Sequence, residues 1–139
     1  WITDESNADT TLTRNFLRHE ALTAISQRFP AAEASLALAA SHFAEAAGLL
    51  DELAEQDWRL VCEGDAARMR TLRELSLPRL KNLLRHRLRC LGWQVPVASR
   101  LEEFARQLQS AAPDRHPELR LPDGKMRVAG GLLHWLSEK

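Results

Sequence analysis

The sequence predicts a mainly α fold, a helical domain of about four helices with a short C-terminal β-hairpin. Apolar residues recur at helical spacing through most of the chain, and proline and glycine interrupt the pattern between segments. Near the end the period changes to two, on either side of the turn sequence Pro122-Asp123-Gly124. A chain of 139 residues, 45% of them hydrophobic, is long and apolar enough to form one domain with a core.

The first two helices are expected at residues 12–28 and 31–61. Phe16, Leu22 and Ile25 recur at helical spacing in the first, and Pro30 marks the break after it. The second segment is rich in Ala and Leu, with large apolar residues at seven-residue intervals, and this pattern predicts a long amphipathic helix. Its Gly48 costs about 1 kcal/mol relative to Ala, which is too little to end the helix.

Two more helices are expected, from residue 75 or 76 to the stop signal at Gly92, and over about residues 100–110. Pro78 is tolerated in a first helical turn, and Ser99 with Glu102 forms a candidate capping box. In the third helix one side is a leucine stripe and the other is polar. The stripe is Leu77, Leu80, Leu84, Leu88 and Leu91, and the polar side is Arg79, Asn82, Arg85, His86 and Arg89. Arg87, at the edge of the stripe, is expected to pair with an acid of the long helix.

The tail is expected to form a hairpin. Leu119 and Leu121 alternate with Arg120 before the turn, and alternation continues after it through residues 126–128. Gly130-Gly131 predicts a second turn, and residues 132–136 a third strand. So small a sheet needs support from the helices or from further chain.

Net charge is zero, but acids and bases are segregated. Residues 31–57 contain six acids and no Lys or Arg, whereas residues 58–97 contain nine Lys or Arg and three acids. Two interpretations follow, and the sequence leaves both open. The two halves pair internally, or the surplus of positive charge contacts phosphate.

Several classes of site and location are not indicated. No apolar run approaches the roughly 18 residues of a membrane span, and no leader peptide is visible. The histidines show no metal-ligand spacing, so no metal site is expected. Cys62 and Cys90 are expected to be reduced core thiols of a cytoplasmic protein. Trp58, Trp93 and Trp135 are expected to serve packing, and Trp1 to end a strand of a preceding domain.

A polar cluster occupies the first twenty residues. Asp4, Ser6 and Asn7 lie together in an expected turn, and Arg14, Asn15 and Arg18 follow on the first helix. Arg14 and Arg18 are four residues apart, so both guanidiniums share one helix face. Such forks can grip a phosphate or carboxylate bidentately. Composition alone favours the simpler interpretation, a capping turn followed by a solvated helix face.

The opening "WITDESNADTTLTRNFLRHEAL…FP" closely resembles the end of the catalytic domain of the bacterial tRNA(Ile)-lysidine synthase family, with its D-x-S-N turn and R-N-x-x-R helix. Later stretches resemble the family more weakly. They are "HFAEAAGLLDELAEQD", "LSLPRLKNLLRHRLRCLGWQVPVASRLEEFARQLQSA" and "ELRLPDGKMRVAGGLLHWL". The resemblance implies three parts: residues 1–30 end the catalytic domain, 31–112 form a helical tRNA-binding domain, and 113–139 form a hairpin leading to a C-terminal domain.

The resemblance also implies an activity for the whole enzyme. It uses ATP with Mg²⁺ to attach L-lysine to C2 of the wobble cytidine of tRNA(Ile) with a CAU anticodon. This chain has no SGGxDS-like phosphate loop, so the piece alone is expected to bind no nucleotide and to be inactive. An ATP-cleaving domain is expected before Trp1. The oligomeric state is left open, a homodimer included.

Residue roles follow from the same resemblance. Arg14 and Arg18 are the expected catalytic residues, and the expected substrate-binding residues are Asp4, Ser6, Asn7 and Asn15. The expected tRNA-binding residues are the cations Arg68, Arg70, Arg73, Arg79, Lys81, Arg85 and Arg89. The competing interpretation is a non-catalytic, all-helical protein-interaction module, which has no need of the cluster at the start. A self-contained enzyme is poorly supported, since no nucleophile–base pair, metal set or phosphate loop is present.

Overall fold

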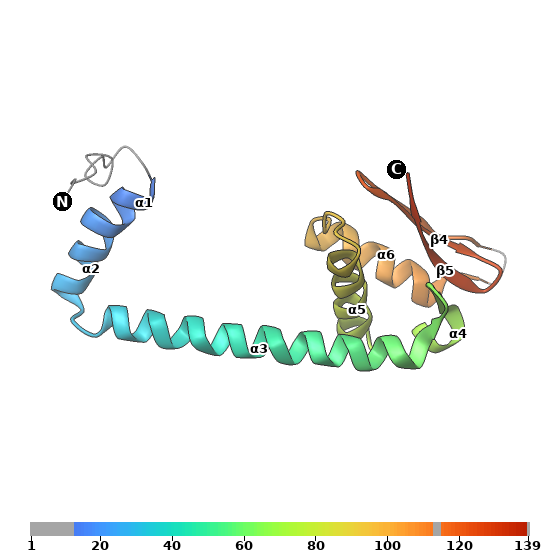
Figure 1. Ribbon diagram of the computed structural model, residues 1–139, viewed down its shortest axis with the longest axis horizontal. Helices are drawn as coiled ribbons and strands as arrows, with labels where there is room; N and C mark the ends of the chain where they lie inside the picture. Colours follow the sequence, from blue (N-terminus) through green and yellow to red (C-terminus); the bar gives the residue numbers. More distant parts are fainter. Residues whose placement is uncertain (1–12, 113–114, 139) are drawn as a thin grey trace, which may run out of the picture. The chain divides into compact units, whose positions relative to one another are not determined.

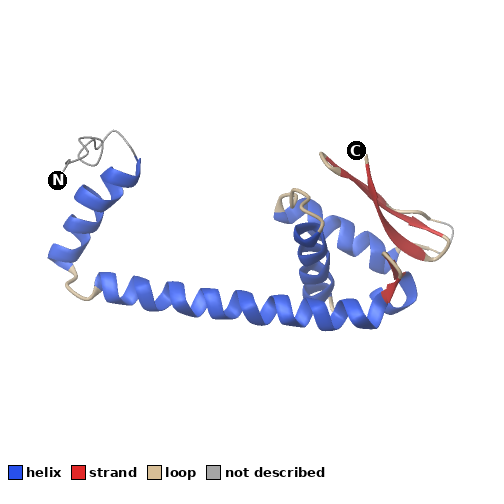
Figure 2. Cartoon of the chain, viewed as in Figure 1, coloured by secondary structure: helices blue, strands red, loops and turns tan. Residues whose placement is uncertain are grey.

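A computed structural model of the protein describes residues 13–112 and 115–138 (Figure 1). The chain divides into two compact units, Trp1–Ala46 and Ala47–Lys139. The long helix α3 (Ala32–Val61) begins in the first unit and ends in the second. The prediction of a mainly α fold with C-terminal strands is confirmed (Figure 2).

The first unit begins with the helix expected at residues 12–28, which contains a π turn that the sequence did not predict. It consists of α1 (Thr13–Phe16), η2 (Leu17–Ala21) and α2 (Leu22–Arg28). The backbone N–H of Leu22 donates to the carbonyl of Leu17, five residues earlier. Phe29 then leaves the helical region, so the helix ends just before Pro30 as predicted.

The second unit contains the end of α3, three further helices and all five strands. The helices are α4 (Met69–Leu72), α5 (Leu77–Cys90) and α6 (Ala98–Ser110). The strands are β1 (Cys62–Glu63), β2 (Ala66–Arg68), β3 (Glu118–Leu121), β4 (Gly124–Ala129) and β5 (Leu132–Ser137). The sheet is antiparallel, in the order β1-β2-β5-β4-β3.

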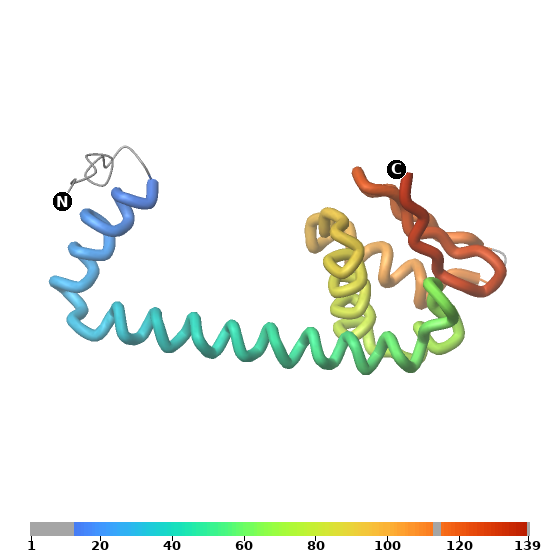
Figure 3. Tube along the Cα trace, viewed as in Figure 1, coloured from blue at the N-terminus to red at the C-terminus, as the bar shows by residue number. Residues whose placement is uncertain are grey.

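The expected C-terminal hairpin is part of this larger sheet. The predicted third strand is present as β5, and it pairs on its other edge with β2. Figure 3 shows the chain running from β3 through β4 to β5, in orange to red, beside the green segment after α3 that contains β2, where the sequence predicted no strand. The support that a small sheet needs therefore comes partly from two short strands within this unit.

Leucines of α5 form the centre of the core. Leu80, Leu84 and Leu88 are fully buried, as predicted, together with residues of α4, α6 and the sheet. Leu91 departs from the expected stripe, because it is 40% exposed at the helix end. α5 begins at Leu77, slightly later than the expected residue 75 or 76, and has Pro78 in its first turn; it ends before the predicted stop at Gly92, which has φ +70°.

The predicted capping box of α6 is wrong. The helix begins at Ala98 with Val97 at the N-cap, and no side chain caps it. Glu102 is drawn away to Lys81, whose Nζ lies 2.7 Å from Oε2, and to Arg106. Because Glu102 pairs with two cations, it does not fold back on the helix start.

Trp58, Trp93 and Trp135 pack as predicted, but Arg87 and Cys90 do not, and Trp1 lies outside the described residues. Trp58 and Trp135 contact the core and meet edge to face, with ring centroids 5.6 Å apart. The expected ion pair of Arg87 is wrong: its guanidinium lies 3.8 Å from the Trp58 ring centroid, a cation–π contact. Cys90 is exposed rather than in the core, and Cys62 is half-buried; both are free thiols.

Candidate functional site

The first candidate site lies in the opening unit, on the helix with the π turn. Arg14 and Arg18 line one hollow together with Thr13, Leu17 and Leu22, so the expected sharing of a helix face is confirmed. Asn15, between them in sequence, is buried. Arg18 lies within the π turn, a distortion that occurs frequently at functional sites. Asp4, Ser6 and Asn7 lie outside the described residues.

The second candidate site is the set of seven cations expected to bind tRNA, and most of them have partners inside the protein. Arg79 donates two hydrogen bonds to the Asp57 carboxylate, from Nε to Oδ2 at 3.2 Å and from Nη2 to Oδ1. Asp57 is fully buried on α3, and its hydrogen bonds and charge raise the pKa of Arg79. Arg89 contacts Asp51, six residues earlier on α3, and Lys81 contacts Glu102. Internal pairing of the acidic and basic halves is therefore confirmed.

Two more of the seven donate to backbone carbonyls. Arg73 donates from Nε to Leu108 O at 3.1 Å and from Nη2 to Ala111 O at 2.8 Å, which ties α4 to the end of α6. Arg68 donates to Leu60 O at 3.1 Å. Within the described residues, Arg70 and Arg85 alone of the seven make no ion pair or side-chain hydrogen bond. Most of these cations are thus structural ties as well as charges.

Asn82 and His86 join the same contact between α5 and α3. Asn82, expected on the polar side of the helix, is 5% exposed and donates Nδ2 to the backbone carbonyl of Leu50 at 2.6 Å. His86 Nδ1 lies 3.4 Å from Asp51, the partner of Arg89. The polar side of α5 is therefore an internal seam against α3, which the spacing within α5 could not reveal.

Sequence reasoning missed a third group of cations, on the outer face of the C-terminal sheet. Arg120 on β3 and Lys125 and Arg127 on β4 surround the carboxylate of Glu118. Its pKa is lowered, first by the hydrogen bond from Arg120 Nε and also by the charges of Lys125 and Arg127. The same bond raises the pKa of Arg120. The available signal was the alternation itself, which puts these residues opposite the buried Leu119, Met126 and Val128.

Two absences hold for the described part of the chain. No group of three His, Cys, Asp or Glu side chains there is arranged to hold a metal ion. None of its helices combines the length and apolar character needed to cross a bilayer. The candidate sites described above consist mainly of Arg and Lys side chains, whose positive charges can bind phosphates and carboxylates.

The chain is similar to proteins of one family. Residues 68–134, from β2 into β5, match the family model described as the TilS substrate binding domain. The chain is 40% identical over 136 residues to a tRNA(Ile)-lysidine synthase of Nitrosomonas europaea, covering 98% of this chain and 30% of that protein. Synthases of the same name from Aromatoleum aromaticum and Pseudomonas putida are 44% identical over 124 residues and 37% identical over 145 residues.

These alignments cover 89% and 99% of this chain, but only 28% and 34% of the two relatives. The chain thus spans about three tenths of the length of the curated relatives that it matches. The resemblance seen in the opening motif extends over almost the whole chain. Residues 68–134 belong to the TilS substrate binding domain family, and the chain around them is similar to the corresponding part of tRNA(Ile)-lysidine synthases.

Proposed function

We propose that this chain is part of a tRNA(Ile)-lysidine synthase, in which it binds tRNA and contributes one wall of the active site. The observation that carries the proposal is the match of residues 68–134 to a substrate binding domain inside a chain whose relatives carry this enzyme's name. The fixed charges described above are chemically suited to such a substrate, because RNA presents a phosphate at every nucleotide.

The proposed reaction of the whole enzyme has two steps. ATP, with Mg²⁺, adenylates the C2 oxygen of the wobble cytidine in a tRNA(Ile) with a CAU anticodon; the bond between the α- and β-phosphates breaks and pyrophosphate leaves. The amine of L-lysine then attacks C2, and AMP leaves with the oxygen. We assign the nucleotide-binding loop to the seven tenths of the enzyme that this chain does not span, and we place the enzyme in the cytoplasm.

Within this scheme, Arg14 and Arg18 act together on a phosphate. Their guanidiniums line one hollow, so they can neutralise a single phosphate of the nucleotide or the RNA. Asp4, Ser6, Asn7 and Asn15 supply the acceptors that hold the lysine amine for attack. Holding a nucleophile close to its target is a large source of rate enhancement.

The test is Arg18→Ala in the complete enzyme, with lysidine formation as the readout. We expect a loss of roughly 100-fold or more in turnover, the scale seen when one charge-stabilising donor is removed from an active site. Arg28→Ala is the matched control, since Arg28 is exposed near the end of the same helix and should leave turnover unchanged. Full turnover by Arg18→Ala would exclude the catalytic role.

A mobility-shift assay of the complete protein with bulk tRNA, at low and moderate salt, separates this function from the alternative. A tRNA-binding protein shifts the RNA and loses affinity as salt rises. A protein-interaction module would leave the RNA unshifted at both salt concentrations.

A further inference from the structure

We propose that the outer face of the C-terminal sheet, rather than the seam of α5, holds the phosphate backbone of the RNA. This inference rests on the proposed function and deepens it. Arg120, Lys125 and Arg127 form what we call the basic sheet face. It lies within the residues that match the substrate binding domain, and no residue of it is among the seven cations that the sequence pointed to.

The strand register places these cations side by side. β3 and β4 pair Arg120 with Lys125 and Glu118 with Arg127, so three positive side chains and one negative side chain share one small patch. Directly opposed side chains in an antiparallel pair lie roughly 5 Å apart. Their strand neighbours Leu119 and Met126 are buried, which turns the charged side chains outward. The face is therefore rigid, because the core fixes the strands beneath it.

The charges on this face do not cancel. Glu118 is the shared partner of three cations, at 2.8 Å from Arg120 Nε, 3.8 Å from Lys125 Nζ and 3.9 Å from Arg127 Nε. A fourth cation, Arg100, donates Nη2 to the Arg120 carbonyl at 2.7 Å, and a second carboxylate, Glu138, acts on Arg120. The three cations of the basic sheet face thus outnumber the two carboxylates that act on them, Glu118 and Glu138, and Arg100 adds a further positive charge beside β3.

The exposed ends of these side chains suit a phosphate ligand. The side chains of Arg120 and Arg127 are 78% and 50% exposed, so their guanidiniums can meet phosphate oxygens without leaving the protein surface. On β5, His134 lies opposite Arg127 and the exposed Leu136 opposite Lys125. Rings and apolar groups beside cations are the usual surroundings of an RNA strand on a sheet. An RNA backbone is therefore the occupant that charge and substrate class together favour.

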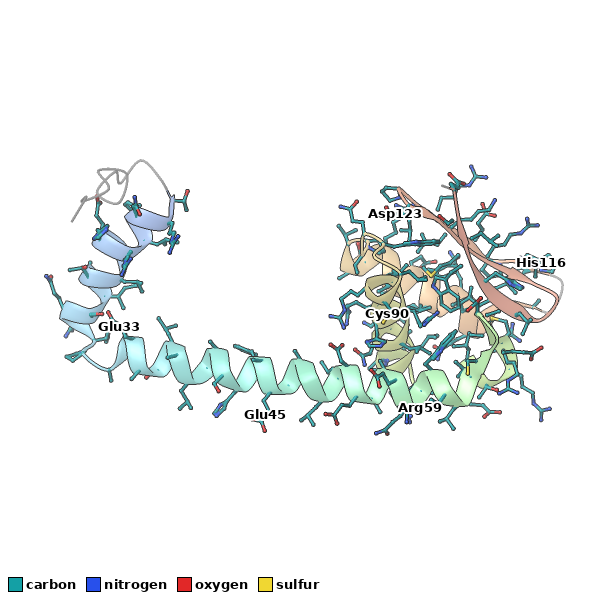
Figure 4. The ribbon with its side chains drawn as sticks, viewed as in Figure 1. Glu33, Glu45, Arg59, Cys90, His116 and Asp123 are labelled. Atoms are coloured by element: carbon teal, nitrogen blue, oxygen red, sulfur yellow. The ribbon has the colours of Figure 1, made fainter. Side chains whose placement is uncertain are left out.

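The experiment measures binding of an unmodified tRNA(Ile) transcript to the complete enzyme over a series of salt concentrations. The variant is Arg120→Gln with Arg127→Gln. The matched control is Arg59→Gln with Arg106→Gln, which removes the same two charges from exposed helical positions that each pair with a glutamate four residues earlier. Figure 4 labels Arg59 on α3, not on the strands β3 and β4 that carry the basic sheet face. Circular dichroism and thermal melting confirm that each variant is folded.

We expect the sheet variant to lose roughly tenfold in affinity near 0.15 M salt, and its plot of log affinity against log salt to flatten by about 1.4 to 1.8, the value for two lost phosphate contacts. The control should keep both values. Glu118→Gln should change affinity in the opposite direction: it removes the carboxylate that the three cations share, so affinity should rise severalfold at low salt.

Equal affinity and equal salt dependence in the sheet variant and its control would overturn the inference, and so would weaker binding by Glu118→Gln. Failure of the proposed function looks different. In that case the unmodified enzyme itself neither binds the transcript nor forms lysidine, whatever the variants do.

Discussion

The seam between α5 and α3 and the outer face of the sheet both carry several cations, but they use them in opposite ways. On α5 the guanidiniums of Arg79 and Arg89 each meet a carboxylate of α3, one of which is fully buried. On the sheet, three cations share the carboxylate of Glu118. The density of basic residues along a sequence therefore does not locate an anion site. The balance of charge after folding does.

The largest effect on stability is expected at the ion pair between the buried Asp57 and Arg79. Asp57→Ala leaves Arg79 without its partner, and removing one member of a buried pair costs about 3–5 kcal/mol when the other stays buried. Because the Arg79 side chain is 43% exposed and can turn to water, we expect a loss of about 2–3 kcal/mol in the free energy of unfolding. Urea titration measures it. A loss below about 0.5 kcal/mol would mean that the seam is not held by this pair.

The position of β4 in the sheet depends on Gly124, which lies very close to the Trp93 ring and the Leu136 carbonyl. A Cβ atom there would come within 2.6 Å of the Trp93 ring and would also meet the Leu136 carbonyl. We expect Gly124→Ala to cost about 1–3 kcal/mol through overpacking, and to weaken RNA binding because β4 carries Lys125 and Arg127. Gly48→Ala is the control, since a Cβ atom there has nothing within 4 Å and should stabilise α3 by up to about 1 kcal/mol.

Arg89→Gln sharpens the contrast between the two regions. Its pair with Asp51 is about half-exposed on both sides, so its loss should change the free energy of unfolding by only about 0–1 kcal/mol. We also expect the salt dependence of tRNA binding to be unchanged, unlike that of the sheet variant. If binding weakened and the salt dependence flattened by about one unit, α5 would be a phosphate contact after all.

The smallest effect concerns pH and Glu102. Hydrogen bonds from Lys81 and then Arg106 lower the pKa of Glu102 from 4.5 to about 2. The ionised carboxylate is thus favoured in the folded state, and its contribution to stability is complete above pH 4.5 and is lost as pH falls towards 2. Thermal melts of the protein and of Glu102→Gln should differ slightly at neutral pH and converge between pH 4.5 and 2. A constant difference would contradict the assignment.

Local signals predicted most of the fold. Pro30 predicted the start of α3, and Pro78 and Gly92 predicted the start and the end of α5. The strand alternation around the turn before Gly124 predicted β3 and β4. The short strands β1 and β2 escaped because two or three residues show no period, and they form only by pairing with each other and with β5. The π turn at Leu17–Ala21 likewise leaves no periodic mark.

The candidate sites were harder to predict than the helices, because partners are chosen by tertiary contact. The sequence predicted that Glu102 caps α6, but in the structure Glu102 forms ion pairs with Lys81 and Arg106 instead. Arg87 stacks on the Trp58 ring instead of pairing with an acid, and Asn82 donates a hydrogen bond to the Leu50 carbonyl on α3. Each of these residues has several chemically reasonable partners, and only the folded arrangement selects one. The helix-face relation of Arg14 and Arg18, which is local, was predictable.

The ties from α5 back to α3 also set a lower limit on any independently folding piece. The family match begins at residue 68, yet Leu50, Asp51 and Asp57 complete the polar side of α5, and Ala54 and Val61 are buried beside it. A recombinant polypeptide trimmed to the match would leave Arg79, Arg89 and Asn82 without their partners on α3. It would also expose the part of the leucine core that α3 covers. Anyone wishing to isolate this module should therefore retain the second half of α3, from about Ala47 onward.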